Sequence, residues 1–202
     1  MKIDKFHLMK QWTIGPWSRL AHITRYSSLP VLHRESVAEH TFFVSIKSYL
    51  IGMDLLHGGV IIDFEAVLRH AIVHDIDEAF TGDIIRPFKY ANPNLKTLMD
   101  QVTSESLRKN LENTPTGQNM FSDWCTSSNY PSLEHNIVKV ADLWSCVHYG
   151  YRELQLGNKF GTNIMVDVRQ WVERHGWHDE IKPYSDGLIR LTRELEVKDG
   201  VQ

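Results

Sequence analysis

The sequence predicts an all-α fold, a helical bundle of roughly seven helices. Apolar residues recur with helical spacing along most of the chain, and the alternation typical of strands is nowhere sustained. Glycine, proline and capping residues separate the periodic segments, as they do between helices. The 202 residues can bury a sizeable core without disulfides, so we expect a single domain over 1–202.

The N-terminal part is predicted to contain a short helix, a second helix start and an extended loop. Residues 3–12 are the first helical segment, and Pro16 stands at the start of the next. The stretch 24–33 has little helical periodicity, so we expect an extended loop there. Ser36 is a suitable N-cap and Glu39 completes a capping box, which together begin the first long helix.

The middle of the chain is predicted to hold two helices and one long loop. A pair of glycines ends the preceding helix, and Asp63 caps the next one, which ends near Phe80. A further helix covers 95–110. Residues 113–132 are rich in Thr, Ser, Asn, Gly and Pro, so we expect a mobile loop over this stretch.

The C-terminal part is predicted to form three helices. The first runs from Leu133 to Leu156 and contains Asp142, and the other two cover 166–175 and 184–197. Four apolar residues of the last helix either finish the core of the monomer or serve a subunit interface: Leu188, Ile189, Leu191 and Leu195.

Composition excludes several classes of protein. Hydrophobic residues make up 42% of the chain and charged residues 23%, which is ordinary for a globular protein. The formal net charge of -3 does not favour a general binder of nucleic acid polymers or of membrane surfaces. The N-terminus lacks the apolar core of a signal peptide and no apolar run approaches membrane-spanning length, so we expect a cytoplasmic enzyme.

Histidine and cysteine usage favours metal chemistry over disulfides. Eleven histidines are a high count, and histidine is the commonest metal ligand. The two cysteines, Cys125 and Cys146, lack the spacing of a metal motif, so we expect reduced thiols.

The adjacent pair His74 and Asp75 is the most informative feature of the chain. A neutral imidazole beside a carboxylate offers nitrogen and oxygen ligands to one divalent metal. His40 lies upstream and Asp142 downstream, each at the edge of another apolar helical pattern. We therefore predict that four ligands from three separate helices converge on one metal ion.

This mixture of ligands suits hydrolytic chemistry. Two neutral imidazoles and two carboxylates balance the charge of a divalent ion and leave positions open for water and a phosphate oxygen. The metal lowers the pKa of the water and withdraws charge from phosphorus. One divalent transition metal is expected, and Co, Zn, Mn, Fe and Ni all fit such ligands.

Neighbouring polar residues have alternative roles. Glu78 lies one helical turn after His74, so both face one side of a helix, where Glu78 either acts on the attacking water or makes a surface pair. Asp83 either approaches the pocket from its rim or belongs to a turn. Asp77 is expected to face solvent. His70 either supports His74 from behind or is an ordinary core residue.

The metal-ligand pattern resembles that of the HD-domain phosphohydrolases, and longer motifs are similar to those of bacterial 5′-deoxynucleotidases. The motifs are Glu35-Ser36-Val37-Ala38-Glu39-His40, His74-Asp75-Ile76-Asp77-Glu78-Ala79-Phe80-Thr81-Gly82-Asp83 followed by Pro87-Phe88-Lys89-Tyr90, and Lys139-Val140-Ala141-Asp142. A His-Asp pair alone is weak evidence. This ordered set, over roughly residues 17–160, is specific.

The resemblance implies an HD-domain bundle that acts on small deoxyribonucleotides. The family hydrolyses deoxyribonucleoside 5′-monophosphates to nucleoside and phosphate, which is the favoured reaction here. A related phage branch removes triphosphate from dATP, so the alternative is a dNTP triphosphohydrolase. Both reactions hydrolyse the same 5′ C–O–P linkage, and the metal motif does not separate them.

The resemblance also implies roles for individual residues. Arg25 matches an arginine that contacts phosphate, and Lys89 matches a basic residue at the pocket rim. Tyr26 stands where the family usually has a Trp against the sugar, a departure that leaves sugar selectivity and substrate choice open. Arg86 is a further cation for a polyphosphate, or an ordinary surface charge. Glu78, with Asp83, helps to position water or to protonate the leaving oxygen.

Two other classes stay open on the sequence alone. Some HD proteins hold two metals and act as phosphodiesterases or oxygenases, and Glu78 and His70 are the candidates for additional ligands. A binding module that keeps the site as a sensor is a non-enzymatic alternative, against which the intact ligand set argues. Relatives are dimers or larger assemblies, so we expect a homo-oligomer.

Overall fold

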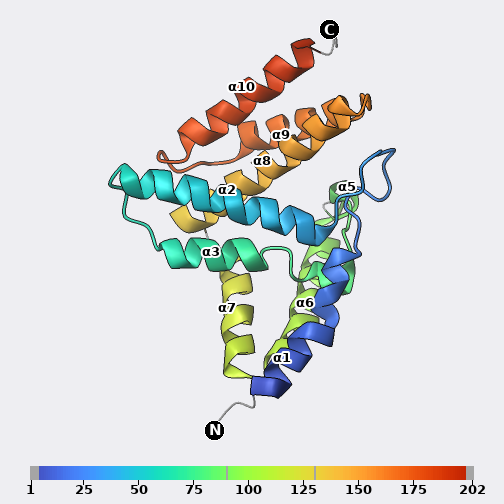
Figure 1. Ribbon diagram of the computed structural model, residues 1–202, viewed down its shortest axis with the longest axis vertical. Coiled ribbons are helices and arrows are strands. Elements are labelled where there is room, and N and C mark those ends of the chain that lie inside the picture. The colour runs from blue at the N-terminus through green and yellow to red at the C-terminus, as the bar shows by residue number, and fades with distance from the viewer. Residues whose placement is uncertain (1–4, 90, 130, 199–202) are drawn as a thin grey trace.

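The structure is a computed structural model that describes residues 5–89, 91–129 and 131–198 (Figure 1). The all-α prediction is confirmed, since these residues form helices and a single isolated β-bridge between Thr24 and Ser36. Eight of the described α-helices have ten residues or more, against roughly seven predicted: α1 (Lys5–Ile14), α2 (Val37–His57), α3 (Phe64–Val73), α6 (Pro93–Leu111), α7 (Pro115–Asn129), α8 (Leu133–Gln155), α9 (Gly161–Arg174) and α10 (Lys182–Lys198). Three shorter elements are the 3-10 helix η1 (Pro16–Ala21), α4 (Glu78–Thr81) and α5 (Arg86–Lys89).

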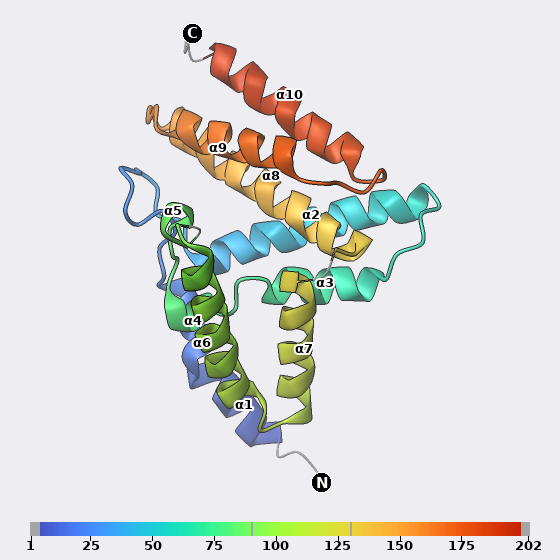
Figure 2. The same ribbon diagram turned by 180° about the vertical axis from the view of Figure 1, so that it is seen from behind.

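The helices form two connected groups along the long axis of the molecule (Figure 1). In one group α2 packs against α8, α9 covers α8, and α10 packs on α9. On the other side of α2 lies α3, which contacts α7, and α6 runs beside α7 (Figure 2). The short helix α4 contacts η1 and α6, so the segment after α3 lies where the two groups meet.

Two predicted helix caps fix the elements that lead into the site. The Glu39 backbone N–H donates to Ser36 Oγ at 3.1 Å, and the Ser36 N–H donates to the Glu39 carboxylate at 2.7 Å. This capping box sets the start of α2 and therefore places His40 in its first turn. Asp63 Oδ1 accepts from the Ala66 N–H at 2.9 Å and starts α3 in the same way.

The core lies along α8, whose buried side chains belong to two apolar clusters. Val44 of α2, Val67 of α3 and Val140 of α8 are fully buried in one cluster. A second cluster joins α8, α9 and α10, and its Leu188 is also fully buried, so this residue of the last helix belongs to the core of the chain. Burial of each such side chain stabilises the fold by about 1.5–3 kcal/mol.

The predicted mobile loop at about 113–132 is wrong for most of its length, because 115–129 form α7. Its N-terminal end is held by the Thr114 hydroxyl, which accepts from the Gly117 N–H at 3.0 Å. Trp124 is 7% exposed and packs in a cluster with the fully buried Leu107 of α6. Packing of these apolar side chains outweighs a local composition that favours turns.

The helix expected to carry the His-Asp pair, α3, ends just before it and earlier than predicted. It ends at Val73, and His74 to Asp77 form a turn before α4 begins at Glu78. The side chains that follow Val73 therefore do not share one continuous helix face.

In the described part of the chain no helix combines the length and the apolar character needed to cross a membrane.

A close contact between α8 and α9 at Gly150 and Gly161 gives a test of this packing. A Cβ atom at Gly161 would lie 2.2 Å from the Gly150 carbonyl oxygen, so Gly161→Ala forces the two helices apart. We expect it to lower the free energy of unfolding by about 1–3 kcal/mol, measured by urea denaturation. Gly176→Ala is the control, because a Cβ atom there meets nothing within 4 Å. Equal stability of both variants would contradict this packing.

Candidate metal centre

Three side chains from different parts of the chain meet at one point. His40 lies on α2, His74 directly follows α3, and Asp142 lies on α8. Each offers one ligand atom, and these atoms all lie within 4.8 Å of one another. The structure thus brings together three of the four residues that the sequence proposes as ligands.

Asp75 lies beside this group without being one of its three members. Its Oδ2 is 3.1 Å from His74 Nε2 and 3.7 Å from His40 Nε2. On the other side, Asp142 Oδ1 is 3.2 Å from His40 Nε2. The two imidazoles therefore face two carboxylates, a donor set that suits a divalent metal ion.

The buried ring nitrogens indicate that a cation belongs here. Among the described residues, both nitrogens of His40 and Nε2 of His74 are buried and make no hydrogen bond of good geometry. His74 Nδ1 lies 2.8 Å from the Ala71 carbonyl oxygen, a contact that favours the tautomer with a lone pair on Nε2. Unpaired buried polar atoms are costly, and a metal ion satisfies them.

Burial and neighbouring charges together set the protonation of His40 and Asp142. Burial lowers the pKa of His40 to about 4, so this imidazole is neutral at pH 7, as metal ligation requires. Burial opposes the ionisation of Asp142, but Lys139 and the two imidazoles outweigh it and hold the pKa of this carboxyl well below its usual range. The Lys139 ammonium donates to Asp142 Oδ2 at 2.7 Å.

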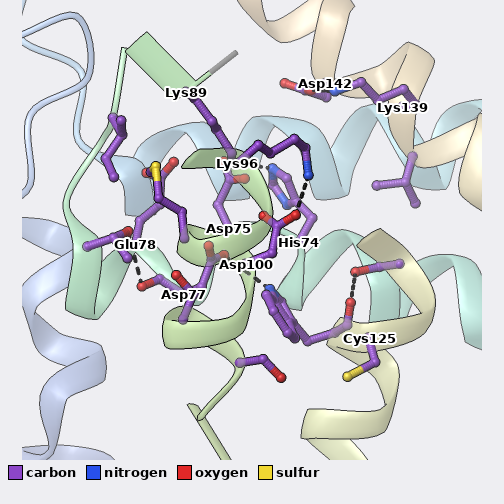
Figure 3. A pocket seen from close by; sticks show the side chains of 18 of the residues that line it. His74, Asp75, Asp77, Glu78, Lys89, Lys96, Asp100, Cys125, Lys139 and Asp142 are labelled. Atoms are coloured by element: carbon purple, nitrogen blue, oxygen red, sulfur yellow. Dashed lines mark hydrogen bonds and ion pairs between the residues drawn. The ribbon is translucent and has the colours of Figure 1, made fainter. Parts of the chain in front are cut away.

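A cavity of about 390 Å³ opens from this cluster. His74, Asp75 and Asp142 line it together with side chains of α4, α5, α6, α7, α8 and α9 (Figure 3). Three lysines line the same cavity: Lys89 of α5, Lys96 of α6 and Lys139 of α8. Two of these lysines pair with carboxylates of the same cavity, Lys96 with Asp100 and Lys139 with Asp142, so an anionic ligand would compete with these carboxylates for the ammonium groups.

Glu78 lines the cavity from the first position of α4. Burial and the neighbouring carboxylates of Asp75 and Asp83 raise its pKa to about 10. Among the described residues its Oε2 is buried without a hydrogen-bond partner. Without a metal ion, Glu78 is therefore protonated at neutral pH, and its carboxyl proton is available beside the proposed ligands.

The prediction that Asp77 faces solvent is wrong. Asp77 lines the cavity, and its Oδ1 accepts from the Trp124 indole N–H at 3.1 Å (Figure 3). Two differences explain this position. The turn after α3 redirects the side chain, and the indole comes from α7, a segment whose composition predicts a loop.

Arg25, Tyr26 and Asp83 form a second group that does not line this cavity. The Asp83 carboxylate accepts from the Tyr26 backbone N–H at 2.8 Å. Tyr26 has a φ of 55°, an uncommon conformation for a residue other than glycine, and this bond supports it. Its ring stacks on Tyr149 of α8 at 5.0 Å, and the Arg25 guanidinium lies 5.3 Å from the Tyr26 ring centre.

His70 and Arg86 are the two remaining residues that the sequence proposes for the site. His70 is 4% exposed within α3 and does not line the cavity, which favours the core alternative. The side chain of Arg86 lies outside the described part of the structure.

Sequence reasoning also missed residues that the structure places at the site. Lys139 lies one helical turn before Asp142, a spacing that can be recognised in the sequence. Lys96 and Trp124 have no such local signal, because only the packing of α6 and α7 brings them to the cavity.

Comparison with known proteins identifies similar sequences over most of this chain. A family model described as 5′-deoxynucleotidase YfbR-like matches residues 14–185. The 5′-deoxynucleotidase PM0747 of Pasteurella multocida (strain Pm70) is 29% identical to this chain over 176 residues, which cover 85% of this chain and 88% of that protein.

Two solved structures have the same fold. An HD-domain phosphohydrolase from Listeria innocua has a TM-score of 0.71 at 21% identity and covers 96% of this chain and 88% of its own. The cyanophage S-2L HD phosphohydrolase DatZ, bound to dA and one catalytic Zn²⁺ ion, has a TM-score of 0.59 at 17% identity and covers 98% and 99%. With its HD-domain fold and a family match over 14–185, the chain belongs to the YfbR-like 5′-deoxynucleotidase family.

Proposed function

We propose that this protein is a metal-dependent 5′-deoxynucleotidase that hydrolyses deoxyribonucleoside 5′-monophosphates to deoxynucleoside and phosphate. The observation that carries the proposal is the buried group of His40, His74 and Asp142, with unpaired imidazole nitrogens, beside a lysine-lined cavity. Family membership and the names of the similar proteins support the substrate class.

One divalent transition metal is proposed, held by His40, His74, Asp75 and Asp142. Within the described residues, a single group of three or more suitable side chains comes together, which supports one ion rather than two. When bound, the ion supplies Lewis-acid activation of a water and of the phosphoryl group. Co, Zn, Mn, Fe and Ni are all compatible with imidazole and carboxylate ligands.

Glu78 is proposed as the proton donor to the leaving 5′ oxygen. Its pKa of about 10 keeps the carboxyl protonated at neutral pH, and it lines the same cavity as Asp75. A cation bound nearby lowers this pKa towards neutral, which is the range that general acid–base catalysis needs.

Arg25 and Tyr26 are proposed to receive the phosphate and the sugar. Asp83 acts through Tyr26, because its carboxylate holds the backbone N–H of that residue. The Tyr149 ring behind Tyr26 keeps the tyrosine in place, so a flat ring face is preorganised beside the substrate.

A second candidate is hydrolysis of a deoxyribonucleoside triphosphate with release of triphosphate. The observation in its favour is the position of Lys89, Lys96 and Lys139 on the walls of one cavity next to the metal centre. A chain of phosphates leading away from the metal would meet these ammonium groups. Both candidate reactions break the same linkage.

We also propose that the protein forms a homo-oligomer, a dimer or larger. An apolar stripe on the outer face of α2 supports this, because its side chains are too exposed for a monomer core: Phe42 at 60%, Ile46 at 46%, Tyr49 at 45% and Leu50 at 60%.

A product assay tests both candidates. Protein stripped of metal is expected to be inactive and to recover activity with Co²⁺, Mn²⁺ or Zn²⁺. Each dNMP and dNTP is then supplied, and the products are separated by chromatography. Free phosphate from monophosphates supports the first candidate. Intact triphosphate from a dNTP, with monophosphates untouched, supports the second, and no turnover with any metal overturns both.

Substitution of Glu78 tests its role as proton donor. Glu78→Gln keeps the shape of the side chain but removes the acidic proton, so kcat is expected to fall about 10²–10⁴-fold. Bound metal, measured by elemental analysis after dialysis, should stay at the wild-type level. A Gln variant with wild-type kcat would remove Glu78 from the reaction.

The lysines separate the two candidate substrates. Lys96→Ala is expected to lower kcat/KM for a dNTP about 10–100-fold under the second candidate and to leave dNMP turnover unchanged. Lys109→Ala is the matched control. Both lysines lie on α6 and pair with a carboxylate one helical turn away, Lys96 with Asp100 and Lys109 with Glu105, but Lys109 does not line the cavity. Equal effects of Lys96→Ala on both substrates would count against a polyphosphate site.

A further inference from the structure

We propose that Glu35 is a positioning residue that joins the metal centre to the phosphate-binding arginine. Its carboxylate serves as a shared negative charge for His40 and Arg25. The inference rests on the proposed function for the role of Arg25, and its effect on metal binding can be measured without any substrate.

The backbone fixes Glu35 in place. Its carbonyl oxygen accepts from the Arg25 N–H at 2.9 Å, and the Val37 N–H donates to the Ile23 carbonyl at 3.0 Å. Thr24 and Ser36 form the β-bridge between these two bonds. This short antiparallel pairing holds the segment with Arg25 against the segment that enters α2, so both side chains start from a fixed frame.

One carboxylate oxygen lies between the two groups. Glu35 Oε2 is 3.1 Å from Arg25 Nη1 and 3.9 Å from His40 Nδ1. The side chains of Glu35 and His40 are 5% and 0% exposed, so water does not screen these interactions. At 3.9 Å the carboxylate acts on the imidazole through its charge, and it favours the tautomer that carries the proton on Nδ1.

That tautomer is the one the metal centre requires. His40 Nε2 faces Asp142 Oδ1 at 3.2 Å and Asp75 Oδ2 at 3.7 Å, so this nitrogen must keep its lone pair to act as a ligand. A proton on Nδ1 then points towards Glu35, and no other described group hydrogen-bonds that atom. Glu35 therefore orients His40 from the side opposite the metal.

Glu35 also compensates the charge of Arg25. Among the described residues it is the carboxylate that pairs with this buried guanidinium, whose other polar contact is Cys146 Sγ at 3.8 Å from Nη2. Loss of the carboxylate would leave a buried positive charge next to the metal centre. That charge repels a divalent cation, and an unpaired Arg25 also moves from its position.

Metal affinity tests the proposal directly. We expect metal-stripped Glu35→Gln to bind Co²⁺ about 10–100-fold more weakly than wild type, as followed by visible absorption during titration. Glu39→Gln is the matched control, because Glu39 belongs to the same segment, is exposed, and can keep its capping box as Gln. Wild-type Co²⁺ affinity in Glu35→Gln, with an intact fold by circular dichroism, would overturn the proposal.

A second set of variants keeps the proposal testable if Glu35→Gln does not fold. Arg25→Met removes the positive charge and leaves Glu35, so Co²⁺ affinity should equal or exceed that of wild type. Where Glu35→Gln does fold, the double variant Arg25→Met/Glu35→Gln should bind Co²⁺ more tightly than Glu35→Gln, since the repelling charge is gone. Weaker binding by Arg25→Met would overturn the shared-charge account.

Kinetics separate this inference from the proposed function. If wild type hydrolyses dNMPs, Glu35→Gln at saturating Co²⁺ should raise KM more than it lowers kcat, because Arg25 is displaced. A fall in kcat alone would contradict the link to Arg25. If wild type hydrolyses no nucleotide, the proposed function fails, while the Co²⁺ titrations still decide the role of Glu35 at the metal centre.

Discussion

The buried imidazole of His40 is the group on which the arrangement of the site depends. Its side chain is fully buried, and charged residues face it on both sides. Nδ1 lies 3.9 Å from Glu35 Oε2, and the same oxygen lies 3.1 Å from Arg25 Nη1. Nε2 lies 3.2 Å from Asp142 Oδ1, and the other oxygen of this carboxylate, Oδ2, lies 2.7 Å from Lys139 Nζ. Two carboxylates thus connect the two nitrogens of one imidazole to two cations, Arg25 and Lys139.

One face of α8 holds the segment that carries Arg25 and Tyr26. Cys146 contacts Arg25, and Tyr149 stacks under Tyr26 while its hydroxyl donates to the His33 carbonyl at 2.5 Å. One turn further, the buried Glu153 accepts from the Leu32 and His33 backbone N–H groups at 2.8 and 2.7 Å. Asp142 lies at the start of the same face. A single helix therefore positions both the metal centre and the extended loop.

The chemistry of the site could be predicted from the sequence, but its surroundings could not. His40, His74 and Asp142 belong to sequence motifs whose combination of histidine and aspartate is typical of a metal site. The structure brings their ligand atoms close enough together to hold one ion. The caps at Ser36 and Asp63 follow from local hydrogen bonding, which is why they were predictable. The helix over 115–129 was not, because the packing of Trp124 against distant helices overrides local composition.

Side-chain direction is the other quantity that local patterns do not determine. The helical pattern predicts that α3 continues past Asp77, but this helix ends at Val73, so the helical period gives the wrong direction for the Asp77 side chain. Glu35 had no assigned role, because its partners Arg25 and His40 are brought together by the pairing of 23–25 with 35–37. Its carboxylate reaches both partners only because these two segments pair. When one buried carboxylate interacts with two partners, the sequence shows only that the residue is present, and the fold is needed to show which groups it contacts.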